Sequence, residues 1–149
     1  MALFLYPIFL NYCIYLTMLK PRLIYLFVLI MAIIGGLVSR ELAPTMVPLF
    51  VGDILWGLAV FLLLRLLFIQ KPLPFIIIIS LIYTWLTEFS QLYRAPWIDS
   101  VRQTFLGKAM LGETFFVGDI ASYTIGVGLG ILIELSLRKL VTTMYPAVA

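Results

Sequence analysis

Long uninterrupted runs of apolar residues alternate with short polar segments along most of this chain. Four of these runs are of membrane-spanning length, at residues 23–38, 50–69, 73–92 and 115–135. Each approaches the roughly 20 residues with which an α-helix crosses a hydrocarbon core about 30 Å thick. The pattern predicts an all-α fold: an integral membrane bundle of four transmembrane helices in one domain at 20–140, followed by a tail at 141–149.

The first 19 residues form a further apolar run, and residues 2–19 carry no charge. A signal peptide would have a basic start and a small-residue cleavage site, and this run has neither. Two interpretations stay open. The run is either an extra N-terminal helix in or across the membrane, or an extension upstream of a natural start at Met18.

The polar segment between the last two spans, residues 93–114, predicts one more element. Pro96 can open a helix at its first turn. In such a helix Ile98, Val101 and Phe105 share one face, with polar residues on the other. We expect a short amphipathic helix that rests on the outer interface or caps the bundle.

Composition supports a membrane protein and excludes several other classes. The 149 residues are 64% hydrophobic and 11% charged, whereas soluble domains carry about 25% charged residues. There is no histidine, the commonest general base and zinc ligand. The lone Cys13 cannot form an intrachain disulfide. The basic residues that give the net charge of +3 are scattered rather than clustered, so we expect no nucleic-acid partner. The apolar composition makes membrane lipid the expected partner. We expect no metal and no cofactor.

The basic residues predict the orientation. One side of the four-span core holds Lys20, Arg22, Arg65, Lys71, Arg138 and Lys139, and the other holds Arg40, Arg94, Arg102 and Lys108. The positive-inside rule then puts both ends of the core in the cytoplasm of a multi-pass protein of the inner (cytoplasmic) cell membrane. Arg65 is expected to extend its charge to the inner face, and Glu134 to pair with Arg138 four residues later.

Four polar residues fall at nearly the same depth near the outer boundary. With a rise of about 1.5 Å per residue, each lies ~24–28 Å from the basic or breaker residue at the inner end of its helix. These residues are Arg40, Asp53, Glu88 and Asp119. Because charge inside a membrane is unfavourable, the three acids should face the interior and pair, with Arg40 and Arg102 as the available cations.

Helical spacing predicts which side chains share a face. Gln91 follows Glu88 by three residues. Asp119, Tyr123, Gly126 and Gly130 also share a face, and the two glycines form a small-residue stripe that lets another helix approach closely. This stripe should carry Asp119 and Tyr123 into the bundle. The candidate ligand-binding residues are therefore Arg40, Asp53, Glu88, Gln91, Trp97, Asp99, Arg102, Asp119 and Tyr123.

These candidates also admit a purely structural interpretation, in which they only link the helix ends. Asp99 and Arg102, three residues apart, are expected to pair with each other. Trp97 suits an aromatic belt at the interface.

Several segments resemble a known family of small bacterial membrane proteins, domain of unknown function 2809. The resemblance covers about residues 20–138 and leaves out residues 1–17, which favours the extension interpretation. The segments are GLVSR (36–40), GDILWGLAVF (52–61), EFSQLYRAPWIDSVRQTFLG (88–107) and FVGDIASYTIG (116–126). The resemblance implies a membrane protein without an assigned activity.

The layout is also similar to VanZ-like proteins, named for a teicoplanin-resistance protein. By that similarity Glu88, Gln91, Arg102 and Asp119 match a helix-end Glu-x-x-Gln, a loop Arg and an Asp that opens the next helix. Those proteins usually carry an Asn after this Asp, where the present chain offers Tyr123. This departure argues against a glycopeptide-related role.

Three functions follow as hypotheses. The first is binding of an envelope lipid, a lipid-linked precursor or an amphiphilic drug at the outer face. The second is a membrane-embedded carboxylate enzyme on a lipid substrate, with Glu88 and Asp119 as acid and base or as ligands of magnesium. The third is a structural membrane subunit. A transporter is disfavoured because the middles of spans 23–38 and 73–92 are almost wholly apolar.

Overall fold

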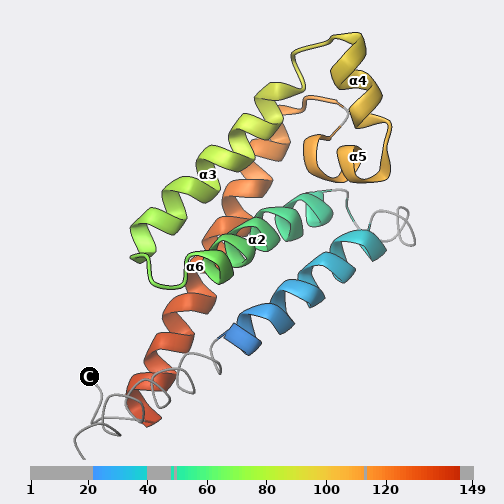
Figure 1. Cartoon of the computed structure of the whole chain (residues 1–149). Helices are drawn as coiled ribbons and strands as arrows, with labels where there is room; N and C mark the ends of the chain where they lie inside the picture. Colours follow the sequence, from blue (N-terminus) through green and yellow to red (C-terminus); the bar gives the residue numbers. More distant parts are fainter. Residues whose placement is uncertain (1–21, 40–47, 49, 113, 145–149) are drawn as a thin grey trace, which may run out of the picture.

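The computed structural model describes residues 22–39, 48, 50–112 and 114–144, and these residues form helices and no strands (Figure 1). Four helices are long and apolar enough to cross a membrane, which confirms the four predicted spans. They are Arg22–Ser39 (here the first helix), α2 (Phe50–Leu67), α3 (Leu73–Ser90) and α6 (Val117–Met144, with the span at Val117–Lys139). The run at residues 1–19 lies outside the described residues, so both of its interpretations stay predictions.

Helix α6 is longer than the sequence pattern predicts. It has 28 residues, or a length of ~42 Å at the standard helical rise, and it continues through Met144 into the segment assigned to the tail. The reason is local. No proline or glycine follows Gly130 until Pro146, so nothing interrupts the helical backbone before that point.

Helix α2 is the centre of the bundle. Half of its span is buried, against 22% for the first helix and 28% for α3. Phe61 and Leu62 of α2 are fully buried and belong to the same core cluster as Leu29, Ile76 and Val127 from the other three spans. A helix surrounded on several sides needs apolar residues on most of its circumference, and the segment AVFLLL at 59–64 supplies them.

The crossing of α2 and α6 depends on glycine. A Cβ atom at Gly57 would lie 2.5 Å from the carbonyl oxygen of Tyr123, and one at Gly126 would lie 2.1 Å from the carbonyl oxygen of Ile54. At Gly130 it would meet the ring of Phe61 at 2.4 Å. The predicted small-residue stripe of α6 is therefore confirmed as the surface on which α2 packs.

The segment between α3 and α6 differs from its prediction. Instead of one amphipathic helix through Phe105, there are two short helices, α4 (Pro96–Arg102) and α5 (Phe105–Leu111). The break follows from Thr104, whose hydroxyl accepts a hydrogen bond from the Gly107 N–H at 3.0 Å. This is the contact of an N-cap, so Phe105 starts a new helix rather than extending the face of Ile98.

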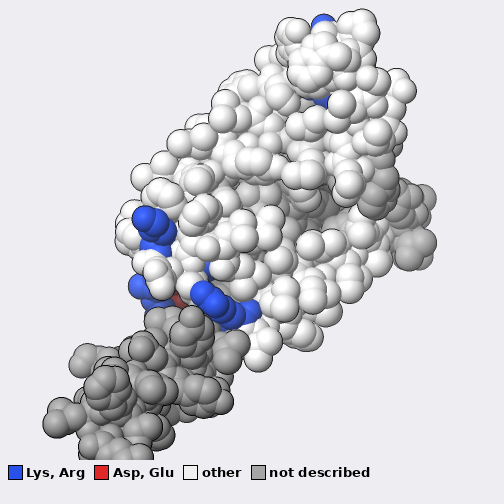
Figure 2. Space-filling view, viewed as in Figure 1, with Lys and Arg blue, Asp and Glu red and all other residues white. Residues whose placement is uncertain are grey.

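On the face shown in Figure 2, the charged side chains of the described residues lie toward the two ends, with an uncharged band between them. We call the end with α4, α5 and the last turn of α3 the polar end. The opposite end, with the α2–α3 turn and Arg138, is the basic end. An uncharged band between charged ends is the distribution expected of a multi-pass membrane protein.

Candidate functional site

Glu88 is the centre of the polar end. It lies in the last turn of α3 and is fully buried. Its Oε1 accepts a hydrogen bond from the Phe116 N–H at 2.7 Å. Its Oε2 accepts hydrogen bonds from Gln91 Nε2 at 2.9 Å and from the Tyr123 hydroxyl at 3.4 Å. Because Phe116 directly precedes α6, this carboxylate joins the end of α3 to the start of α6.

The donors to Glu88 within the described residues are all neutral. A buried carboxylate is tolerated when hydrogen bonds replace its hydration, and two side chains and one backbone N–H do so here. Arg102, one of the two cations expected to be available to the three acids, does not bond to Glu88. The physical reason is that the Arg102 guanidinium is engaged elsewhere.

Arg102 caps the end of α3. Its buried guanidinium donates to the backbone oxygens of Ser90 at 2.6 Å and Tyr93 at 2.9 Å, and to Asp99 Oδ1 at 3.1 Å. The last carbonyls of a helix have no partner within it and carry the negative end of its dipole. The Ser90 oxygen also accepts a hydrogen bond from the Tyr93 N–H at 3.1 Å, and Arg102 adds a charged donor to it from the last turn of α4. The predicted pairing of Arg102 with Asp99 is confirmed.

Gly112 makes room for Gln91. It has a positive φ of 67°, a conformation that favours glycine, and it directly follows the last residue of α5. A Cβ atom here would lie 2.5 Å from Gln91 Nε2, the atom that donates to Glu88. Within the described part of the chain, Gln91 Oε1 is buried without a hydrogen-bond partner.

The remaining candidates are Asp53, Asp119, Trp97 and Arg40. Asp53 and Asp119 are partly buried in the first turns of α2 and α6, where the helix dipole favours negative charge. Trp97 is exposed on α4 beside the ring of Tyr93, with ring centroids 6.2 Å apart. Arg40 lies outside the described residues. The structure thus joins Glu88, Gln91 and Tyr123 in one group and Asp99 with Arg102 in a second.

Two hollows lie near these groups. The first is a polar cavity of about 400 Å³, lined by Arg94, Asp99, Arg102, Gln103 and Thr114. Arg94 and Asp99 lie 3.6 Å apart there, and both are accessible. The cavity offers cationic, anionic, amide and hydroxyl groups together, which suits a polar group with both donors and acceptors.

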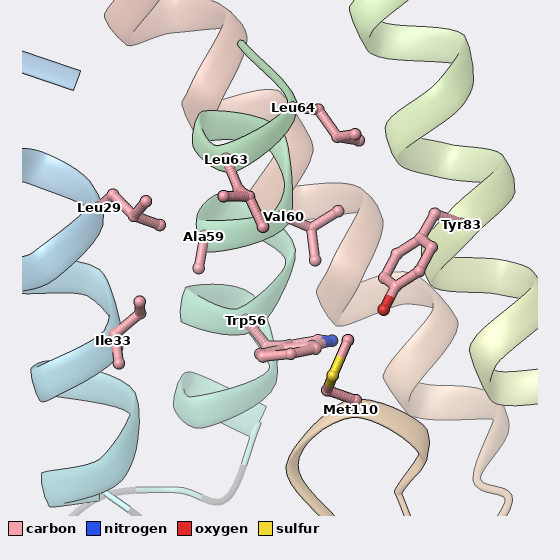
Figure 3. A pocket seen from close by; sticks show the side chains of 9 residues that line it. All are labelled: Leu29, Ile33, Trp56, Ala59, Val60, Leu63, Leu64, Tyr83 and Met110. Atoms are coloured by element: carbon pink, nitrogen blue, oxygen red, sulfur yellow. The ribbon is translucent and has the colours of Figure 1, made fainter. Parts of the chain in front are cut away.

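The second hollow is an apolar cavity of about 270 Å³, which we call the lateral groove (Figure 3). Helix α2 forms its floor, the first helix and α3 form its walls, and Met110 of α5 lies at one end. Trp56, Tyr83 and Met110 lie together at this end. Its lining residues are Leu29, Ile33, Trp56, Ala59, Val60, Leu63, Leu64, Tyr83 and Met110. The sequence pattern did not indicate it, because each lining residue alone looks like ordinary packing.

The basic end holds a buried ionic network that the sequence indicated only in part. Glu134 of α6 is fully buried and accepts hydrogen bonds from the Tyr25 hydroxyl and from two arginines. Arg65 reaches it through Nε at 3.0 Å and Nη2 at 2.6 Å, and Arg138 through Nε at 2.7 Å. The predicted pair of Glu134 and Arg138 is confirmed. We call these four side chains the basic-end network.

The prediction for Arg65 needs correction. It does extend toward the basic end, since Nη1 donates to the backbone oxygen of Lys71 at 2.7 Å. Its guanidinium, however, is buried and neutralised by Glu134 inside the bundle rather than exposed at the interface. The cause is the neighbouring α6, which brings a carboxylate to the same depth.

A family model described as a protein of unknown function (DUF2809) matches residues 42–127, more than half of the chain. The chain belongs to this family. The DUF2809 match includes α2, α3, α4, α5 and the start of α6, and so contains Glu88, Arg102 and the floor of the lateral groove. The first helix and Glu134 lie outside the matched range. No solved structure matches the chain.

Proposed function

We propose that this DUF2809 protein binds one amphiphilic molecule of the membrane, a lipid or lipid-like compound. Its apolar chain lies in the lateral groove and its polar head lies at the polar end, which the distribution of basic residues places on the outer side of the membrane. The observation that carries the proposal is the groove between the first helix and α3, with Met110 of α5 at the end nearest the polar groups.

The physical role of the groove is selection by shape. Lipid tails are as apolar as leucine side chains, so moving a chain from the bilayer into the groove gains little hydrophobic free energy. Affinity must therefore come from polar groups at fixed positions. The hydroxyl of Tyr83 and the indole N–H of Trp56 belong to residues at the groove end near α5. The polar cavity beside α4 offers further partners for a head group.

The buried polar residues hold together the helices that form this site. Glu88 and Arg102 use their charged groups to hold α3, α4 and the start of α6 together. The chain then runs through α5, which places Met110 at the groove. In this proposal Glu88, Gln91 and Tyr123 position the polar end, and the accessible Trp97 and Asp99 face the head group.

The enzymatic alternative has weaker support. Both carboxylate oxygens of Glu88 already accept hydrogen bonds, and the side chain is fully buried. A general acid or base must come within hydrogen-bond reach of the proton that it transfers. Among the described residues, no three carboxylate or cysteine side chains converge on a point where they could hold a metal ion. Binding is therefore the function that the geometry supports best.

The test fills the groove by enlarging one of its own lining side chains. Leu63 lines the groove and is 47% exposed, so Leu63→Trp adds volume there without enlarging the buried core. Leu132 on α6 is 61% exposed and lies outside the groove lining, and Leu132→Trp is the matched control. The purified proteins are irradiated in bilayer nanodiscs with a phosphatidylglycerol that carries a diazirine on its acyl chain, and the labelled peptides are mapped.

We expect the wild type to carry more label on groove peptides than on the lipid-facing side of α6. Leu63→Trp should reduce the groove label several-fold, and Leu132→Trp should leave it unchanged. A lipid-linked precursor or an amphiphilic drug that competes for the groove label would narrow the ligand class. Equal labelling of the groove and of α6, unchanged by Leu63→Trp, would refute the proposal.

A further inference from the structure

We infer that the basic end carries a separate binding site for the phosphate of an anionic phospholipid. The site consists of the exposed basic residues at the end of the bundle that holds the buried Arg65–Glu134 pair. They come from the first helix, the α2–α3 turn and α6: Arg22, Lys71, Arg138 and Lys139. It is independent of the lateral groove, with which it shares no residue.

The hydrogen bonds of the Arg65 guanidinium link the α2–α3 turn to α6. Arg65 donates through Nη1 to the backbone oxygen of Lys71 at 2.7 Å and through Nη2 to Glu134 Oε1 at 2.6 Å. Arg138 donates to the same Oε1 through Nε at 2.7 Å. The Tyr25 hydroxyl donates to Glu134 as well. It thereby brings the first helix, with Arg22 three residues earlier, to the same end.

The charge of this end is strongly positive. Among the residues that the structure describes, this end holds five basic ones, of which Arg65 and Arg138 contact the one carboxylate of Glu134, so these six residues carry a net charge of +4. The other acids of the described residues, Asp53, Glu88, Asp99 and Asp119, belong to helix ends on the polar side. The Arg65–Glu134 pair is buried, whereas Arg22, Lys71, Arg138 and Lys139 are exposed. Figure 2 shows Lys and Arg atoms gathered at this end of the face in view.

Two of the exposed cations are held in place by their neighbours. Arg138 contacts Glu134 Oε1 through both Nε and Nη2, each at 2.7 Å, while half of its side chain stays exposed. The Lys71 ammonium lies 5.8 Å from the centroid of the Phe75 ring. A guanidinium that is already oriented loses less side-chain entropy when it binds a phosphate. The structure thus provides a prearranged site rather than a set of mobile charges.

The position of the site favours a lipid phosphate over free phosphate. The basic residues lie at the ends of apolar spans, at the depth where lipid head groups lie. Basic pockets between membrane helices bind anionic head groups, and each basic side chain near the surface contributes about 1 kcal/mol. That contribution corresponds to a change of about fivefold in the dissociation constant for each charge removed.

The experiment measures lipid binding to the full-length protein in detergent by native mass spectrometry. Phosphatidylglycerol and phosphatidylcholine with identical acyl chains are titrated in parallel. We expect the wild type to bind phosphatidylglycerol more tightly. Lys71→Gln and Arg138→Gln should each weaken this binding about fivefold, and the double variant about 25-fold. Binding of phosphatidylcholine should not change. Arg138→Gln leaves Arg65 and Tyr25 on Glu134, so thermal unfolding should stay close to that of the wild type.

Lys108→Gln is the matched control, because it removes one positive charge from α5, at a residue outside the described linings of both hollows. An equal loss in Lys108→Gln would show that net charge alone attracts the lipid, and would overturn the inference. Displacement of the lipid by millimolar inorganic phosphate would overturn it too. Leu63→Trp, which fills the lateral groove, should leave the preference for phosphatidylglycerol unchanged, so this inference and the proposed function fail separately.

Discussion

Removing Glu134 should destabilise the bundle more than any other change of a single charged group in its described part. Glu134→Gln keeps the size of the side chain and removes its charge. The Arg65 guanidinium then stays buried, with two donors that formerly met carboxylate oxygens at 2.6 and 3.0 Å. Breaking a buried ion pair by removing one partner costs about 3–5 kcal/mol, because the remaining charge is desolvated without compensation. We expect a loss of about this size in the free energy of unfolding.

The ion pair can be isolated by a double-mutant cycle. Arg65→Met fills similar space with an apolar side chain, so Arg65→Met with Glu134→Gln leaves no buried charge without a partner. Replacing a buried pair by packed apolar groups is often close to neutral, and the double variant should recover about 2–3 kcal/mol relative to the sum of the two single variants. The assay is unfolding in mixed micelles with increasing denaturing detergent, followed by circular dichroism.

The result also bears on the proposed function. Glu134 holds the first helix through Tyr25, and the first helix is one wall of the lateral groove through Leu29 and Ile33. Glu134→Gln should therefore reduce groove labelling as well as stability, and the double variant should recover only the stability. If Glu134→Gln lies within about 0.5 kcal/mol of wild type, or if the two single losses simply add, the argument for a desolvated ion pair is refuted.

Three further predictions test the other parts of the structure. Glu88→Ala leaves the Phe116 N–H and two side-chain donors without their acceptor, and should lower the unfolding free energy by about 2–3 kcal/mol in the same assay. Gly126→Ala forces a Cβ to within 2.1 Å of the Ile54 carbonyl oxygen and should separate α2 from α6, whereas Gly128→Ala, with nothing within 4 Å, should be neutral or up to about 1 kcal/mol stabilising. Equal thermal stability of the two glycine variants would contradict the close crossing. Met110→Ala opens the end of the groove near α5 and should shift diazirine labelling toward α5 without loss of folded protein.

The sequence pattern predicted those features of the structure that involve a single helix. The four spans follow from run length, and the buried face of α6 follows from the spacing of Gly126 and Gly130. The pairs Asp99–Arg102 and Glu134–Arg138 follow from helical neighbours three and four residues apart. In each case the partner lies on the same helix, or the pattern itself marks the contact surface.

The sequence pattern did not predict the contacts that depend on which helices are neighbours. Arg65 and Glu134 are 69 residues apart and meet only because α2 packs against α6. The sequence nonetheless contained a signal that these two charges lie at a similar depth. Arg65 is six residues from Lys71 and Glu134 four from Arg138, so depths of ~9 Å and ~6 Å from the basic residues place both charges at a similar level. The lateral groove has no such signal, because it arises from the spacing between the first helix and α3.

Similar depth does not establish contact, and the polar end shows why. Glu88 and Arg102 both lie there, yet Glu88 accepts its hydrogen bonds from neutral donors. Arg102 instead donates to the backbone oxygens of Ser90 and Tyr93 and to Asp99. Helix ends supply competing partners that a comparison of depths leaves out. The buried charges at both ends therefore serve mainly to hold the helices in place: Glu88 and Arg102 at one end, Arg65 and Glu134 at the other. Between these two linked ends, the walls and floor of the groove need no polar contacts of their own, which leaves the apolar surface on which the proposed binding depends.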